Sequence, residues 1–303
     1  MADLLQHFVN GLTLGGIYAI IALGYTMVYG ILKFINFAHG EVLMSGTYVG
    51  LFAFLALRGD STSQAWIVFA FAIALLISMT TSALLGFTIE RIAYRPLRKA
   101  KRLTLLLTAI GVSIILMNTA GWMFGTHSRR FPYPFANQPI RFGLFSITPH
   151  QILILAVCLV VMVALKLFVD KTRLGKAMRA TSLDFDVARL MGINANSIIS
   201  LTFVIGSALA GIAGVLIALD FTVYPTMGTT AGLKAFIAAV IGGIGNISGA
   251  MAGGILLGLL ETFGVAVLGI PVGLRDTIAF ATLIIILLVK PEGLFGKRER
   301  EKV

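Results

Sequence analysis

Charged residues are scarce in this sequence. Asp, Glu, Lys and Arg make up 12% of the 303 residues, whereas they make up about a quarter of an ordinary soluble domain. Uncharged runs extend over 4–32, 61–89, 103–128, 142–165, 190–219 and 235–260. Each run is longer than the ~20 apolar residues that a helix needs to cross a ~30 Å hydrocarbon core. The sequence therefore predicts an all-α, polytopic transmembrane helix bundle in a lipid bilayer, and it excludes one soluble domain.

Cysteines and catalytic motifs are also lacking. Cys158 is the only cysteine, so intramolecular disulfides and cysteine-rich metal sites are excluded. The chain contains no phosphate-binding G-x-x-x-x-G-K-[ST] loop and no G-x-S-x-G, H-E-x-x-H or C-x-x-C motif. We therefore expect no catalytic residues, no metal, no cofactor and no enzymatic activity.

The N-terminus and the net charge exclude two further interpretations. Residues 1–7 lack the basic region of a secretory signal, so the first apolar run is expected to remain as a span. The net charge of +11 comes from basic residues that flank the apolar runs and do not alternate with aromatic residues. Nucleic acid is therefore not an expected partner.

We predict eight or nine spans in a single transmembrane domain, 1–303. They lie near 9–30, 41–57, 65–89, 103–124, 149–169, 197–219, 232–246, 249–268 and 272–289. Basic residues favour the cytoplasmic side, and most of the 24 lie in three clusters. These are Arg91, Arg95, Arg98, Lys99, Lys101 and Arg102; Lys166, Lys171, Arg173, Lys176, Arg179 and Arg189; and Lys290, Lys297, Arg298, Arg300 and Lys302.

An even number of predicted spans separates each basic cluster from the others, so all three can be cytoplasmic together. This arrangement places the N-terminus outside, the C-terminus inside, and the Pro- and aromatic-rich loop 125–148 outside. The glycine-rich stretch 232–268 leaves the count open. Two short spans there keep the basic tail inside, whereas one span with a re-entrant segment gives eight.

Glycines in this stretch have two interpretations. Gly249 with Gly253, and Gly254 with Gly258, have the four-residue spacing that lets two helix backbones approach closely. Interrupted apolar segments also lie beside the pathway in transporter folds. We therefore take three of these glycines as candidates for the pathway: Gly242, Gly243 and Gly245.

Ionisable residues inside spans are costly and become functional candidates by default. Glu261 lies well inside a predicted span with no opposite charge nearby in sequence, and the alternative is a structural, hydrogen-bonded carboxylate. A proton- or sodium-coupled carrier usually has a chain of membrane carboxylates or histidines. Their scarcity favours an energy source outside the membrane.

The most distinctive short segment is 36–41, at the inner end of the first predicted hairpin. Its candidates for a pathway or hairpin role are Asn36, His39, Gly40 and Glu41. A zinc site needs three or four ligands, and the other histidines are predicted on the external side. Local hydrogen bonding that fixes the hairpin is the favoured interpretation.

The cytoplasmic segment 170–196 is too long for a simple turn. Its apolar residues are small and its charges have both signs, which favours a helix that docks on a protein partner over one that lies on anionic lipid. The candidate coupling residues are Lys176, Arg179, Ala180, Asp184, Asp186, Arg189, Met191 and Gly192.

Several segments resemble the LivH-type permease of bacterial high-affinity branched-chain amino acid ABC importers. They are 10–19, 24–30, 35–41, 90–98, 191–194, 201–206, 239–245 and 301–303. The resemblance runs in register over nearly the whole chain, and the one substantial departure is the external loop 125–148.

The resemblance implies a permease in the bacterial inner membrane that translocates leucine, isoleucine and valine. It implies a periplasmic binding protein, a paralogous permease as heterodimer partner and two cytoplasmic ATPases, with 170–196 as the coupling segment. Urea-type and sugar-type permeases share this architecture. The alternatives are therefore a related permease for urea, amides or other small polar solutes, and an ion-coupled secondary carrier.

Overall fold

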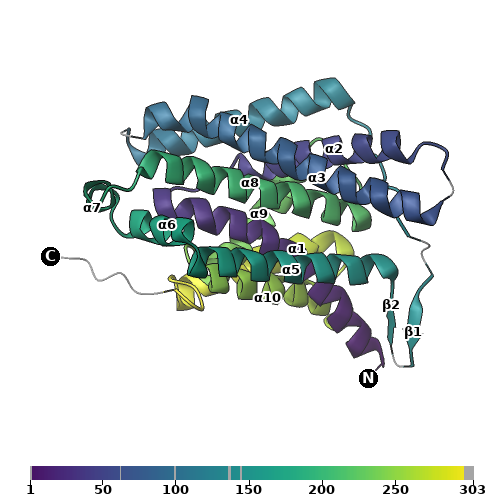
Figure 1. Ribbon diagram of the computed structural model, residues 1–303. Coiled ribbons are helices and arrows are strands. Elements are labelled where there is room, and N and C mark those ends of the chain that lie inside the picture. The colour runs from purple at the N-terminus through teal and green to yellow at the C-terminus, as the bar shows by residue number, and fades with distance from the viewer. Residues whose placement is uncertain (1, 62, 99, 136–137, 144, 297–303) are drawn as a thin grey trace.

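The chain forms a bundle of long helices (Figure 1). The computed structural model describes residues 2–61, 63–98, 100–135, 138–143 and 145–296. Some residues named in the sequence predictions lie outside the described residues. They are Lys99, Lys297, Arg298, Arg300, Lys302 and the segment 301–303.

Eleven α-helices, three shorter helical turns and one β-hairpin make up the described chain. In order they are α1 (Ala2–Leu32), α2 (His39–Arg58), α3 (Gln64–Ile89), a π-turn (Glu90–Tyr94), a 3-10 turn (Arg95–Leu97), α4 (Arg102–Phe124), β1 (Ile140–Phe142), β2 (Phe145–Ile147), α5 (Pro149–Lys171), α6 (Arg173–Leu183), α7 (Phe185–Leu190), α8 (Ala195–Asp220), α9 (Met227–Gly242), α10 (Ile247–Ala266), a 3-10 turn (Val272–Leu274) and α11 (Arg275–Val289). The two strands pair antiparallel.

The predicted helical membrane bundle is confirmed. Within the described residues, eight helices are long and apolar enough to cross a membrane, and α9 is a shorter apolar helix of 16 residues. The glycines of the stretch 232–268 interrupt neither helix, because Gly243 and Gly245 form the turn between α9 and α10. The predicted span 232–246 is displaced toward the N-terminus, because α9 occupies Met227–Gly242.

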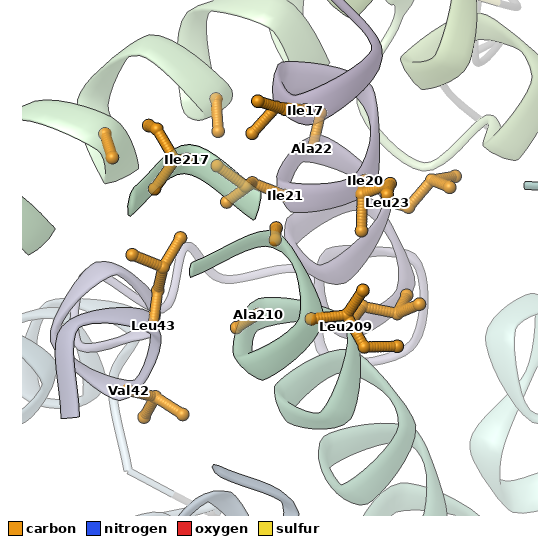
Figure 2. Close-up of a cluster of buried hydrophobic side chains, with 14 of the residues drawn as sticks. Ile17, Ile20, Ile21, Ala22, Leu23, Val42, Leu43, Leu209, Ala210 and Ile217 are labelled. Atoms are coloured by element: carbon orange, nitrogen blue, oxygen red, sulfur yellow. The ribbon is translucent and has the colours of Figure 1, made fainter. Parts of the chain in front are cut away.

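The core lies between α1, α2 and α8. Ile17 and Ile21 of α1 and Leu43 of α2 are fully buried, and Leu209, Ala210 and Ile217 of α8 belong to the same cluster of buried side chains (Figure 2). In contrast, α4, α5 and α11 keep most of their surface exposed at the periphery of the bundle. Peripheral helices rich in exposed Leu and Ile are the arrangement that lipid requires.

Glycines allow α10 to lie closely between two helices. Gly254 and Gly258 face α1, where an added Cβ at Gly258 would lie 2.3 Å from the backbone nitrogen of Gly15. Gly249 and Gly253 face α9 and contact the backbone of Gly242. The packing interpretation of both spaced pairs is thus confirmed, with each pair serving a different neighbour.

The two ends of the bundle differ in chemistry. At one end lie α6, α7, the basic connection between α3 and α4, and the segment after α11 (Figure 1). There Arg98 donates a hydrogen bond to Asn196 at the start of α8 (2.6 Å). The basic loops predicted to share one side of the membrane do lie at one end.

The opposite end carries the β-hairpin and the aromatic loop (Figure 1). Phe131 is buried and stacks on Phe54. His150, at the start of α5, pairs with Asp220 at the end of α8 (3.2 Å). The described part of the Pro- and aromatic-rich loop 125–148 is therefore anchored to the bundle; residues 136–137 and 144 lie outside the described ranges.

Candidate functional site

Two helices begin inside the bundle and not at its end. The ring of His39, the first residue of α2, packs against Gly24, and its centroid lies 4.7 Å from that of Tyr25. Because α1 continues to Leu32, α2 starts roughly 12 Å inside the end of α1 at 1.5 Å per residue. The chain after α1 therefore turns back into the bundle before α2 begins.

Helix α9 begins beside the start of α2. An added Cβ at Gly228 would lie 2.4 Å from the carbonyl oxygen of Gly40, and Gly232 also contacts the Gly40 backbone. The segment 221–226 leads from the end of α8 to this point without helical structure. Backbone that is not helical at membrane depth is tolerated where it lines a cavity or is buried in protein. The break in helical structure therefore lies at 221–226, before α9 begins.

Asn36 holds the turn between α1 and α2. Its Oδ1 accepts hydrogen bonds from the Tyr94 hydroxyl (2.6 Å) and from the backbone N–H of Ala38 (3.1 Å). Phe34 packs edge-on against the Tyr94 ring. Asn36 therefore does form the local hydrogen bonds that the sequence suggested for this segment.

Glu41 lies where α2 meets α9. It is fully buried, and its Oε1 accepts a hydrogen bond from the Thr229 hydroxyl (2.7 Å). Its Oε2 lies against Gly228 and has no hydrogen-bond partner among the described residues. No described Lys, Arg or His side chain forms an ion pair with it, so its neighbours are the Thr229 hydroxyl and the start of α9.

A cavity of about 330 Å³ opens next to Glu41. It lies between α1, the turn before α2, α4 and α9, and it is lined by Tyr25, Phe37, Ile110, Ser113, Ile114, Met117, Gly228, Thr229, Gly232 and Leu233. The lining combines three hydroxyl groups with aliphatic and aromatic side chains, as small-molecule sites commonly do. Of the residues predicted from the segment 36–41, Glu41 is the one whose hydrogen-bond partner, Thr229, lines this cavity.

Glu261 is surrounded by charges that its own sequence neighbourhood does not reveal. Lys234 of α9 places its Nζ 3.1 Å from Oε1, and Arg275 of α11 places its Nε 3.1 Å from Oε2. The Tyr18 hydroxyl of α1 donates to Oε2 (3.0 Å), and Lys234 also pairs with Asp276 (2.7 Å). Two cations thus balance two carboxylates and join four helices, which favours the structural interpretation of Glu261.

The predicted glycine candidates lie at the other end of α9 from the cavity. The backbone of Gly242 accepts a hydrogen bond from Phe295 N–H (3.1 Å), and Gly243 and Gly245 have φ values of 99° and 96°. Gly245 lines a small cleft of about 70 Å³ together with Met178 and Arg179 of α6. These glycines shape the turn beside the predicted coupling segment.

The segment 170–196 forms two short helices that project from one end of the bundle (Figure 1). Thr172 accepts a hydrogen bond from Gly175 N–H at the start of α6, and Asp184 accepts from Asp186 N–H and Val187 N–H at the start of α7. Gly192, with a φ of 81°, follows α7. Side-chain caps of this kind stabilise helix starts.

The predicted coupling residues divide into two groups. Arg179 is directed back to the bundle, because it donates to the Val169 carbonyl and lies 3.7 Å from Asp170. The other residues lie on or beside the projecting helices: Lys176, Ala180, Asp184, Asp186, Arg189, Met191 and Gly192. Leu183 and Leu190 are not among the predicted coupling residues, yet they are 87% and 86% exposed, and Met191 is 78% exposed. Contrary to the sequence prediction, the exposed apolar residues of this segment are therefore not all small.

These features define a class of protein. Membrane-length helices surround a cavity where two helices begin inside the bundle, and no group of three His, Cys, Asp or Glu that could hold a metal occurs in the described part of the chain. Such an arrangement is that of a multi-pass membrane permease.

The comparisons identify the family. A family model described as "Branched-chain amino acid transport system / permease component" matches residues 7–287, and the chain belongs to this family. The chain is 47% identical over 307 aligned positions to the high-affinity branched-chain amino acid transport system permease protein BraD of Pseudomonas aeruginosa, covering 99% of this chain and 98% of that protein. It is 45% identical to the corresponding permease protein LivH of Escherichia coli, covering 99% and 97%.

A solved structure has the same general fold. The chain superposes on an ABC transporter in an inward-facing conformation with a TM-score of 0.51 at 13% sequence identity, covering 94% of this chain and 84% of that one. At this identity the likeness extends to the fold alone.

Proposed function

We propose that this chain is the membrane-spanning permease subunit of an ABC importer that carries leucine, isoleucine and valine into the cell. The observation that carries this proposal is the near full-length identity to permease proteins of high-affinity branched-chain amino acid transport systems. A periplasmic binding protein delivers the amino acid, a paralogous permease completes the pathway, and two ATPase subunits supply the energy. The chain itself is not catalytic.

The cavity between α1, α4 and α9 is the proposed segment of the pathway. Its aliphatic and aromatic walls, including Ile110, Met117 and Leu233, suit a branched aliphatic side chain. Its polar groups are few and convergent, which is the usual composition of a site for a small amphiphilic solute. A shallow, weakly binding cavity suits a permease that must release its cargo.

The end that carries α6 and α7 is proposed to face the cytoplasm. The basic loops gather there, which follows the positive-inside rule. The described chain begins at the opposite end of the bundle (Figure 1), so the N-terminus is outside, and the segment after α11 is inside.

The exposed face of α6 and α7 is the proposed contact for an ATPase subunit. Leu183, Leu190 and Met191 are exposed apolar side chains on or beside these helices, and charges of both signs lie near them in sequence at Asp186 and Arg189. An apolar centre with a charged rim is typical of a protein interface. Movement of this face can reach the core because Arg179 joins α6 to α5.

Reconstitution tests the proposed transport function. The complete complex, reconstituted in proteoliposomes with its binding protein, is expected to accumulate radiolabelled leucine only when ATP is present. The chain alone is expected to show neither ATP hydrolysis nor uptake. Leucine uptake by the chain alone under a proton or sodium gradient would establish the ion-coupled carrier, and uptake of urea but not leucine by the complex would establish the urea-type permease.

Leu190→Asp tests the proposed ATPase contact. Because Leu190 is 86% exposed, the substitution should change the stability of the helix bundle by no more than about 0.5 kcal/mol. A charge in the apolar centre of an interface should reduce leucine-dependent ATP hydrolysis by about tenfold or more. Leu190→Met is the matched control and should retain coupling. Normal transport by Leu190→Asp would show that this face does not contact the ATPase.

A further inference from the structure

We propose that the cavity beside Glu41 recognises the ammonium group of the transported amino acid. Thr229 and Ser113 provide the contacting hydroxyl oxygens, and Glu41 provides the negative charge behind them. This inference rests on the proposed function, because it assigns a binding role within the same pathway. It names residues that meet the cargo inside the membrane, separately from recognition by a binding protein.

The first argument is the orientation of the hydroxyl of Thr229. This hydroxyl donates its one hydrogen to Glu41 Oε1 at 2.7 Å. A hydroxyl has one donor and two acceptor lone pairs, so the remaining capacity of Thr229 Oγ1 is to accept. Thr229 lines the cavity, and so does Ser113 of α4. The cavity therefore presents acceptors to a cargo that carries N–H donors.

The second argument is the charge of Glu41. A buried carboxylate is costly unless it is paired and hydrogen-bonded, yet Glu41 is 0% exposed and its Oε2 has no hydrogen-bond partner among the described residues. The positive end of the α9 dipole, at Gly228, offers partial compensation. A cation in the cavity would supply the remaining compensation for the carboxylate. The cation would donate a hydrogen bond to the Thr229 hydroxyl, which itself donates to Glu41, and charge strengthens both hydrogen bonds.

The third argument is the fit of the remaining cavity to an aliphatic side chain. Ile110, Ile114, Met117 and Leu233 form an apolar wall beside the two hydroxyls. A cargo with an ammonium group and a branched apolar side chain can satisfy both parts of the lining. A sugar would leave the apolar wall facing hydroxyl groups, which is unfavourable.

A purely structural role for Glu41 is the competing explanation. By accepting from Thr229 and lying against Gly228, the carboxylate could serve only to fix the start of α9 on α2. The two explanations differ for substitutions that preserve packing. A structural role predicts loss of assembly or thermal stability, whereas a cargo role predicts loss of transport in a stably assembled complex.

The test uses the complete complex reconstituted with saturating leucine-loaded binding protein. Glu41→Gln preserves the side-chain volume and removes the charge, and Thr229→Val preserves the shape and removes the hydroxyl. The loss of a hydrogen bond to a charged group should reduce the leucine transported per ATP hydrolysed by about tenfold or more. Thr229→Ser keeps the hydroxyl that Thr229→Val removes, and it is expected to transport leucine as the wild type does.

The outcomes separate this inference from the proposed function. If the wild-type complex does not transport leucine, the proposed function is wrong. If the wild type transports leucine and Glu41→Gln or Thr229→Val transports it equally well, the ammonium site is wrong. If the variants lose assembly or thermal stability in parallel with transport, and Thr229→Ser does not restore transport, Glu41 has only the structural role.

A chemical probe provides a second readout. Ser113→Cys in the complete complex places a thiol in the cavity, where it can react with cationic 2-aminoethyl methanethiosulfonate or neutral methyl methanethiosulfonate. The negative charge of Glu41 should favour the cationic reagent by about tenfold over the ratio measured with Glu41→Gln. Equal ratios in the two backgrounds would overturn the inference. Cys158 is buried, and labelling of the parent complex corrects for it.

Discussion

Glu41 and Glu261 are both fully buried, but their surroundings differ. Glu261 has two cationic partners, Lys234 and Arg275, within 3.1 Å and joins four helices. Glu41 has a hydroxyl partner, a helix start and a neighbouring cavity of about 330 Å³. Sequence position places Glu41 at the start of one predicted span and Glu261 inside another, but it shows the surroundings of neither.

The difference separates a structural carboxylate from one that is available to cargo. Breaking a buried ion pair leaves an uncompensated charge, so the Glu261 cluster resists local rearrangement of α9, α10 and α11. No such cluster holds Glu41 among the described residues, and its neighbour Thr229 lines open space. We conclude that α9 is anchored by ion pairs on one face and borders the cavity at its start.

Lys234→Met should produce the largest change in stability. The substitution preserves much of the side-chain volume but leaves Glu261 with Arg275 alone and leaves Asp276 without its lysine. Removal of one partner from a buried pair should lower the free energy of unfolding by about 3 kcal/mol. Thermal unfolding of the purified complex measures this loss, and an unchanged midpoint would show that the cluster does not stabilise the bundle.

Lys234→Met combined with Glu261→Gln should recover much of that stability. The pair of substitutions removes one charge of each sign, and Gln can still accept from the Tyr18 hydroxyl. The double variant should be more stable than Lys234→Met by about 2 kcal/mol, because the remaining charges of the cluster, Arg275 and Asp276, again balance. Strictly additive losses in the double-mutant cycle would argue against direct coupling of Lys234 and Glu261.

Asp276→Asn should have a small effect. Asp276 lies 2.7 Å from Lys234, but its side chain is 55% exposed, so water screens the pair. Exposed ion pairs contribute about 0–1 kcal/mol, and the same thermal measurement should detect a loss within that range. A loss as large as that of Lys234→Met would show that Asp276, and not Glu261, is the principal partner of the lysine.

Glu41→Gln should have the smallest effect on stability. The amide oxygen can still accept from Thr229, and no ion pair is lost. The free energy of unfolding should change by no more than about 0.5 kcal/mol. A much larger loss would place Glu41 with Glu261 as a structural carboxylate, and it would remove the distinction between the two sites.

Some parts of the structure could be predicted from sequence for a simple reason. Span positions depend on local apolar length, so the uncharged runs place nearly all the long helices correctly. Glycine pairs such as Gly254 and Gly258 predict close packing because removing a side chain has the same effect in any helix contact.

Other features depend on contacts between distant residues. Lys234 and Arg275 lie on different helices from Glu261, so nothing near Glu261 in the sequence indicates its partners. The start of α9 at Met227 depends on the close approach of Gly228 to Gly40, which no periodicity reveals. The role of Thr229 as the partner of Glu41 was missed for the same reason.

The most direct test of the account compares Glu41→Gln with Glu261→Gln in the same reconstituted complex. For each variant, the thermal midpoint and the leucine transported per ATP hydrolysed are measured together. We predict that Glu41→Gln keeps its midpoint and loses about tenfold or more of its transport, whereas Glu261→Gln loses thermal stability and keeps its transport ratio in the fraction that assembles. Equal transport by wild type and Glu41→Gln, or a fall in midpoint for Glu41→Gln as large as that for Glu261→Gln, would contradict the account.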